Sequence, residues 1–163
     1  MLPLYKALAR PHLEFAVQLC SPHYLGDIEK IEKVQRKASK MIPNLRNKRY
    51  QERLKDLELI TLEQRRLRGQ LIETFKYLKG ITRATPEGLF DLDANVRTRT
   101  NGLKLRTRAS RTTVKNKFFP TTIVSTWNNL PENVVTARTL NTFKARLDTH
   151  WTSNAPTLQL THR

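Results

Sequence analysis

The sequence predicts a mainly α-helical protein, and three observations support this fold class. Apolar residues recur at spacings of three and four along several stretches, which is the pattern of a helix with one buried face. Residues that cap or stop helices stand at the ends of those stretches. Only one short, basic stretch alternates in the manner of a strand. With 163 residues, of which 38% are apolar, the chain can form one ordinary domain or two small ones around a modest core.

The N-terminal part carries two helical patterns. The first runs from Leu4 to Leu19 and is expected to be interrupted or kinked near Pro11, because a proline disfavours helical geometry at the residue before it. The second is D-I-E-K-I-E-K-V-Q-R-K-A-S-K-M-I, which is stopped by Pro43. We expect its apolar residues to form one buried stripe, which contains Ile28, Ile31, Val34, Ala38 and Met41.

A third helix is expected from Thr61 to Gly80, and a short bridging helix over 50–57 precedes it. Thr61 is a candidate N-cap with Gln64 as its reciprocal partner, and Gly80 suits the position just past the helix end. The buried stripe of this third helix is expected to contain Leu67, Leu71, Phe75 and Leu78.

Three arginines stand in the first two turns of this third helix: Arg65, Arg66 and Arg68. Positive charge near a helix N-terminus is electrostatically unfavourable, because it opposes the helix dipole. We interpret these arginines as facing either phosphate or solvent.

Downstream of Gly80 the helical pattern weakens. Residues 81–93 form a poorly periodic linker, and the alternation from Leu103 to Arg106 favours an extended segment or a hairpin around Asn101-Gly102. Two further helices are then expected, the first with Pro120 in its first turn and the second capped by Thr139. Their apolar residues at helical spacing are Phe119, Ile123, Trp127, Leu140, Phe143 and Leu147.

Charge is the strongest compositional signal. Lys and Arg number 30 against 14 Asp and Glu, a formal net charge of +16, and the stretch from Ala94 to Leu130 holds eight Lys or Arg and no acid. Such an excess indicates a polyanionic partner, nucleic acid first and an anionic membrane surface second, with a merely solvated basic surface as the alternative. No apolar run is long enough to span a membrane and no secretion signal is recognisable, so we expect a soluble chain.

Signals for catalysis or metal binding are weak. The single Cys20 excludes an internal disulfide, and with His12 and His23 it matches no common zinc pattern, so a buried apolar role is expected. Asp91 and Asp93 are interpreted as turn residues rather than metal ligands. The chain has no glycine-rich phosphate loop and no hydrolase motif, so we expect no enzymatic activity, no cofactor and no metal site.

The order of several motifs resembles a known family. These motifs are L-Y-K-A-L-A-R-P-H-L-E-F-A-V-Q-L-C-S-P, then D-I-E-K-I-E-K-V-Q-R-K-A-S-K-M-I, R-R-L-R-G-Q-L-I-E-T-F-K-Y-L-K-G, R-T-R, F-F-P-T-T-I-V-S-T-W-N-N-L-P-E-N-V-V and T-F-K-A-R-L-D. From about Leu4 to Trp151 the chain is similar to the thumb and C-terminal region of reverse transcriptases of non-LTR (LINE-type) retrotransposons, particularly jockey- and CR1-like ones.

The resemblance implies that catalysis and nucleic-acid binding belong to different regions of the parent enzyme. In that family the catalytic aspartates lie in the palm, upstream of the matched region, an endonuclease usually precedes the palm, and no D-D dipeptide occurs here. The chain is therefore expected to be a non-catalytic, nucleic-acid-binding fragment of an RNA-directed DNA polymerase. The implied organisation is a helical thumb-like domain (1–80), a linker with a basic extended segment (81–115), a C-terminal helical unit (116–151) and a frayed tail (152–163).

The expected partners are RNA, DNA or their hybrid, bound independently of sequence, and a palm domain supplied by another chain, in the nucleus or the cytoplasm. One alternative is a helical protein-interaction module that docks on an acidic partner or on the palm, and another is a pseudogene product without function. Exposed apolar surface near Leu4, Leu8 and Leu13 would mark the face that a palm covers. The candidate phosphate-binding residues are Lys33, Arg36, Lys37, Lys40, Arg65, Arg66, Arg68, Arg97, Arg99, Lys104, Arg106, Arg108 and Arg111.

Overall fold

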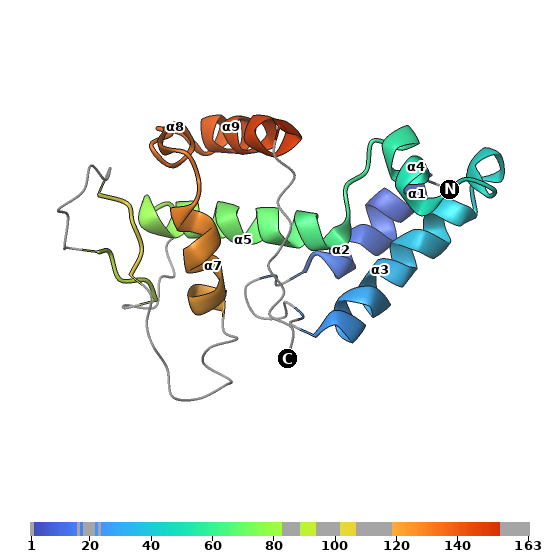
Figure 1. Cartoon of the computed structure of the whole chain (residues 1–163), viewed down its shortest axis with the longest axis horizontal. Coiled ribbons are helices and arrows are strands. Elements are labelled where there is room, and N and C mark those ends of the chain that lie inside the picture. Colours follow the sequence, from blue (N-terminus) through green and yellow to red (C-terminus); the bar gives the residue numbers. More distant parts are fainter. Residues whose placement is uncertain are drawn as a thin grey trace. The chain divides into compact units, whose positions relative to one another are not determined.

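A computed structural model describes residues 2–15, 17, 22, 24–82, 89–93, 102–106 and 119–153. These residues are mainly α-helical, as predicted, and the described part holds no sheet (Figure 1). The chain divides into two compact units, the first holding the residues up to Gly69 and the second beginning at Gln70. None of the helices in the described ranges carries an apolar run that could cross a lipid bilayer.

The first helical segment of unit 1 has three parts: α1 (Leu2–Leu4), the π-helical turn η1 (Tyr5–Ala9) and α2 (Arg10–Leu13). The π turn stands immediately before Pro11, which has no N–H to donate to a helical carbonyl, so the predicted interruption is confirmed. The helix ends at Leu13, and Glu14 and Phe15 form a turn. The expectation that helical structure continues towards Leu19 is therefore wrong at these two positions.

Helix α3 (Leu25–Lys40) confirms the second helical pattern. The 3₁₀ turn η2 (Pro43–Leu45) follows it, and α4 (Tyr50–Asp56) is the predicted bridging helix. Figure 1 shows α3 running alongside the first helical segment and α4. The main apolar side chains buried between these elements are Tyr5, Leu45, Leu54, Leu59 and Leu62.

The buried side of α3 is polar, and this corrects the sequence-based expectation. The residues that α3 buries are Glu32, Gln35 and Ser39. Val34 and Met41, both members of the predicted buried stripe, are 40% and 58% exposed. Hydrogen bonds from neighbouring elements hold the polar side inward, and they override the pattern of apolar residues.

Helix α5 (Leu62–Leu78) begins and ends where the sequence predicts. The backbone N–H of Gln64 donates to Thr61 Oγ1 at 3.2 Å, and Gly80 follows the helix with a φ of +63°, a conformation that favours glycine. Gly69 lies against Val17, where an added Cβ would come within 3.2 Å of a methyl group. A larger residue would separate α5 from this neighbour.

The helices described in unit 2 are the second half of α5, α7 (Phe119–Asn128), the unpredicted short helix α8 (Glu132–Val135) and α9 (Leu140–Ser153). Thr139 caps α9 as predicted, because its Oγ1 accepts the N–H of Thr142 at 3.2 Å. The core is aromatic: the rings of Phe75 and Phe143 stack with centroids 4.3 Å apart, and the Trp127 ring lies 6.0 Å from Phe143. This packing joins the second half of α5 to the C-terminal helices, so the boundary between units falls inside α5, ahead of Gly80.

Candidate nucleic-acid interface

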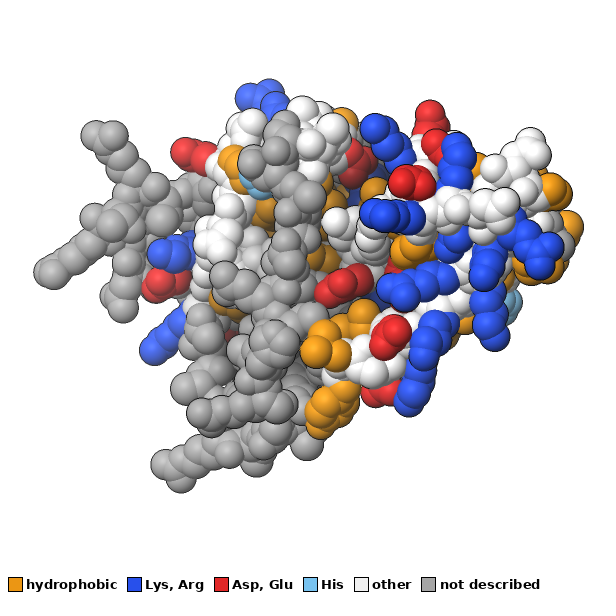
Figure 2. Space-filling view, turned by 45° about the vertical axis from the view of Figure 1, so that its right-hand side comes forward, with side chains coloured by type: hydrophobic (Ala, Val, Ile, Leu, Met, Phe, Trp, Pro, Cys, Tyr) orange, Lys and Arg blue, Asp and Glu red, His pale blue; other side chains and the backbone are white. Residues whose placement is uncertain are grey.

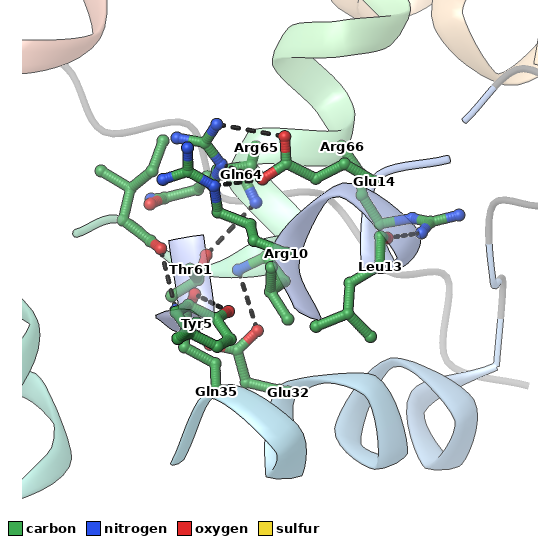
Figure 3. Close-up of polar contacts among 12 residues, drawn as sticks. Tyr5, Arg10, Leu13, Glu14, Glu32, Gln35, Thr61, Gln64, Arg65 and Arg66 are labelled. Carbon is green, nitrogen blue, oxygen red and sulfur yellow. Dashed lines mark hydrogen bonds and ion pairs between the residues drawn. The ribbon is translucent and has the colours of Figure 1, made fainter. Parts of the chain in front are cut away.

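Gln35 sits at the centre of the contacts that fix the rotation of α3. Its side chain is fully buried. Tyr5 Oη donates to Gln35 Oε1 at 2.7 Å (Figure 3). Gln35 Nε2 donates to Tyr50 Oη at 3.0 Å and to the carbonyl of Ile60 at 3.0 Å. One amide therefore connects α3 to the first helical segment, to α4 and to the residues before α5.

Glu32 extends this arrangement by one helical turn. Its carboxylate accepts a short hydrogen bond from Tyr50 Oη and the backbone N–H of Leu62 at 2.9 Å. The second contact caps the N-terminus of α5, where a negative charge is favourable. We call Tyr5, Glu32, Gln35 and Tyr50 the polar cluster.

The environment of the polar cluster keeps its tyrosines protonated. Burial, together with the nearby charge of Glu32, raises the pKa of Tyr5 to about 12. Burial and the hydrogen bond to Glu32 also raise the pKa of Tyr50. Both hydroxyls therefore keep their protons further into the alkaline range than free tyrosine and remain donors in the contacts to Gln35 and Glu32.

A row of cations lies on the solvent-facing side of α3. We define the basic face of α3 as Lys33, Arg36, Lys37 and Lys40, all of which are exposed. Within the part of the chain that the structure describes, none of these four is in an ion pair. From Lys33 to Gln51 the sequence holds seven Lys or Arg and no acid, and Figure 2 shows blue side chains gathered over α3 and α4.

Two exposed lysines of unit 1 outside this face are each paired with an acid. Lys30 Nζ lies 2.9 Å from Asp27 Oδ1, and Lys48 Nζ lies 2.7 Å from Asp56 Oδ2. The hydrogen bond to Asp56 raises the pKa of Lys48. The basic face of α3 differs from these pairs because its charge is not compensated within the described residues.

The predicted arginines of α5 make contacts within the chain. Arg65 forms a bidentate ion pair with Glu14, which also lies 3.4 Å from Arg10 (Figure 3). Arg66 is only 6% exposed and donates through Nη1 to the carbonyl of Leu13. These contacts fasten the C-terminal end of α2, whose carbonyls lack helical partners, to the first turns of α5. Arg68 is half-buried on the same half of α5 and is not part of the basic face of α3.

The basic stretch after α5 is described only over residues 102–106. Leu105 is buried and pairs with Leu92 in an isolated antiparallel bridge, so the predicted extended segment is confirmed there. Its outward neighbours Lys104 and Arg106 are exposed. The side-chain amide of Asn128 donates to Leu105 O and accepts from Leu105 N, both at 2.9 Å, and so anchors the segment to α7.

Four predicted contact residues lie outside the described residues: Arg97, Arg99, Arg108 and Arg111. Asn101, the first residue of the proposed hairpin turn, and Cys20 also lie outside them. The described partner of Leu105 is Leu92 rather than a residue adjacent to that turn.

The aromatic residues predicted at helical spacing on α7 are core residues. Phe119 and Trp127 are 5% and 2% exposed, and the Trp127 indole N–H donates to Leu103 O at 2.9 Å. Asp91 and Asp93 contribute backbone atoms to the bridge, with Arg106 N donating to Asp91 O at 2.8 Å. Among the described residues, no group of three His, Cys, Asp or Glu side chains could hold a metal ion.

Sequence reasoning missed the contact between α3 and α4. The guanidinium of Arg36 lies over the ring of Tyr50, 5.0 Å from its centroid. The acid-free run from Lys33 to Gln51 is the signal that could have drawn attention to it, because the run joins these two helices.

No protein family, curated protein or solved structure was found to match this chain.

Proposed function

We propose that this protein binds nucleic acid through the sugar-phosphate backbone, independently of base sequence, as the thumb region of a non-LTR reverse transcriptase does. The observation that carries the proposal is the basic face of α3: four exposed cations on two turns of one helix, with no ion pair among the described residues. The resemblance of the ordered motifs to that family supports the same function on grounds other than charge. Binding of this kind needs no catalytic group and implies a location in the nucleus or the cytoplasm.

The physics favours phosphate over a folded acidic protein as the ligand of this face. A row of uncompensated cations at helical spacing matches a repeated charge along a polymer, and each contact releases condensed counterions from that polymer. Such contacts set position and affinity without reading bases. The polar cluster supports the proposal because it fixes the side of α3 that faces solvent.

The test is a measurement of affinity for a labelled RNA-DNA hybrid, single-stranded RNA and duplex DNA across a salt series. We expect a log-log slope of about −4 or steeper, since each phosphate contact contributes about 0.7 to 0.9. The variant Lys33→Gln, Lys37→Gln, Lys40→Gln should flatten the slope by about 2 to 3 and weaken binding roughly tenfold or more at low salt.

The matched control removes the same charge from unit 2, through Lys79→Gln, Arg138→Gln and Lys144→Gln. We expect this variant to bind within about twofold of the parent chain if the basic face of α3 is the contact. Equal losses in both variants would show that only net charge matters. An absence of binding at low salt would contradict the proposal itself.

A second candidate function rests on the outer side of the first helical segment. Leu4 and Leu8 are 58% and 64% exposed, and Ala7 and Pro11 between and beyond them are also exposed. Tyr5, on the other side of the same segment, is buried. A helix that is apolar on both sides is usually covered on both. We propose a polymerase palm domain as the cover, as the family resemblance implies.

The test of this second function is binding of the chain to a recombinant palm domain of a jockey-type reverse transcriptase. The variant Leu4→Gln, Leu8→Gln should abolish that binding while leaving nucleic-acid affinity unchanged, because neither residue belongs to the basic face of α3. Lys30→Gln serves as an exposed control. Palm binding that survives the double leucine variant would exclude this face as the contact.

A further inference from the structure

Arg36 differs from the other cations on the basic face of α3. Its guanidinium carbon lies 5.0 Å from the centroid of the Tyr50 ring, which is a favourable cation-π distance. The side chain is nevertheless exposed, and in the part of the chain that is described its N–H groups have no acceptor. Arg36 is therefore held at its aromatic contact while its donors face solvent.

The Tyr50 ring is itself held in place by buried groups. Its hydroxyl donates to Glu32 and accepts from Gln35 Nε2 at 3.0 Å. A second guanidinium, that of Arg53, lies 5.5 Å from the same ring centroid. Arg53 is 7% exposed, and its Nε donates to Ser39 Oγ at 3.2 Å. The platform under Arg36 is thus tied to the interior of unit 1.

Lysines on the same face have no such support among the described residues. Lys33, Lys37 and Lys40 carry point charges on flexible stems and lose rotamer freedom when they bind. An arginine stacked on a ring keeps its in-plane N–H groups available as a fork, which fits two oxygens of one phosphate. Less freedom is lost on binding when the fork is already oriented.

We propose that Tyr50 is a positioning residue for phosphate binding, which holds Arg36 for a bidentate contact with a backbone phosphate diester. Arg36 is then the anchor of the basic face of α3, and it contributes more to affinity than any of the three lysines. The inference rests on the proposed nucleic-acid function and names the group and the residue pair through which that function operates.

The test is a pair of double-mutant cycles read as Kd for a labelled RNA-DNA hybrid. One cycle combines Tyr50→Leu with Arg36→Gln, and the other combines Tyr50→Leu with Lys37→Gln. Arg36→Gln and Lys37→Gln each remove one positive charge, at adjacent positions, so the two cycles can be compared directly. We expect Arg36→Gln to raise Kd roughly tenfold and Lys37→Gln about two- to threefold, since bidentate charge-assisted contacts are the stronger ones. Tyr50→Leu should cost little more once Arg36 is Gln, but its effect should multiply with that of Lys37→Gln.

Three conservative variants separate positioning from stability. Tyr50→Leu also removes hydrogen bonds to Glu32 and Gln35, so its circular dichroism and thermal unfolding are measured alongside, and Tyr50→Phe restores the ring without the hydroxyl. We expect Tyr50→Phe to keep the affinity within about twofold. Arg36→Lys keeps the charge and the salt slope but should weaken binding several-fold, whereas Lys37→Arg should not weaken it. If Tyr50→Leu does not fold, these variants decide.

Equal effects of Arg36→Gln and Lys37→Gln, each multiplying with Tyr50→Leu, would overturn the positioning role and leave the proposed function intact. An Arg36→Lys variant that binds as tightly as the parent chain would also overturn it. If the parent chain binds no nucleic acid at low salt, the proposed function fails first, and the two failures are distinguished by that measurement.

Discussion

Units 1 and 2 both bury apolar side chains but differ in the residues at their centres. The centre of unit 1 contains the fully buried amide of Gln35 and the hydroxyls and carboxylate that surround it. The centre of unit 2 contains the stacked rings of Phe75 and Phe143, both fully buried. Apolar packing supplies most of the free energy of folding, whereas buried hydrogen bonds add a modest net amount and are costly when broken. We therefore interpret unit 2 as held by packing and α3 in unit 1 as oriented by directional contacts.

This difference bears on the candidate interface. Hydrogen bonds specify an angle, and in unit 1 they specify the angle at which α3 lies on its neighbours. The hydrogen bonds decide that Glu32, Gln35 and Ser39 are buried while Val34 and Met41 stay exposed. The four cations lie away from the apolar stripe as well as from the polar side, so they face solvent in this orientation.

The largest effect is expected from removing an aromatic ring in unit 2. Phe143→Ala should lower the free energy of unfolding by about 3 to 5 kcal/mol, through lost burial and the cavity beside Phe75 and Trp127. Urea unfolding followed by circular dichroism measures the loss. Asn141→Ala, an exposed change on the same helix, should stay within about 0.5 kcal/mol. A loss below about 1 kcal/mol for Phe143→Ala would refute the packing account of unit 2.

A somewhat smaller effect is expected from Gln35→Ala in unit 1. The change leaves the hydroxyl of Tyr5 and the carbonyl of Ile60 without their partner, which should cost about 3 kcal/mol of unfolding free energy. The control is Gln51→Ala, on the exposed side of α4, with an expected cost under about 0.5 kcal/mol. Hydrogen exchange at the amides of α3 reports whether the loss is local. Equal stability of the two variants would mean that the polar cluster does not hold α3.

The next prediction concerns alkaline pH. Burial raises the pKa of Tyr5 from the ordinary tyrosine value of 10.0 to about 12, so the unfolded chain loses this proton first as the pH rises. The associated stability is complete below about pH 10 and is lost between about pH 10 and 12; it amounts to about 3 kcal/mol, at about 1.4 for each pKa unit. Tyr5→Phe should remove this part of the pH dependence of urea unfolding. Identical pH profiles for Tyr5→Phe and the parent chain would contradict the assignment.

The smallest effect is expected at the partly exposed ion pair between Arg65 and Glu14. Arg65→Gln should lower the free energy of unfolding by about 1 kcal/mol or less, because solvent and salt screen the charges. The loss should shrink as salt is added, and unfolding curves at low and high salt measure it. A loss that does not depend on salt would point to packing of the arginine stem instead.

The sequence predicts the helices because their signals are local. Thr61 and Thr139 cap helices within three residues of their partners, and Gly80 ends one helix through its own backbone conformation. The buried side of α3 could not be predicted in this way. Gln35 faces the interior because it forms hydrogen bonds with the hydroxyls of Tyr5 and Tyr50, which lie 30 and 15 residues away in the sequence.

The residues of the candidate site also differ in whether local sequence signals predict their positions. The four cations of the basic face of α3 follow from helical periodicity and lie together as predicted. The partners of Arg65 and Arg66 could not be predicted from the sequence, because Glu14 and Leu13 lie 51 and 53 residues earlier. The contact between Arg36 and Tyr50 depends on how α4 meets α3, and no single helix contains that information.

Both tryptophans, Trp127 and Trp151, belong to unit 2, whereas Tyr5, Tyr24 and Tyr50 belong to unit 1. Tryptophan fluorescence therefore distinguishes unit 2 from unit 1. Indole emission, excited beyond the tyrosine absorption band, observes only unit 2, where Trp127 lies in the aromatic core and donates to Leu103. A denaturation in which fluorescence and helical signal change together would reveal one cooperative transition, and a lag between them would resolve two.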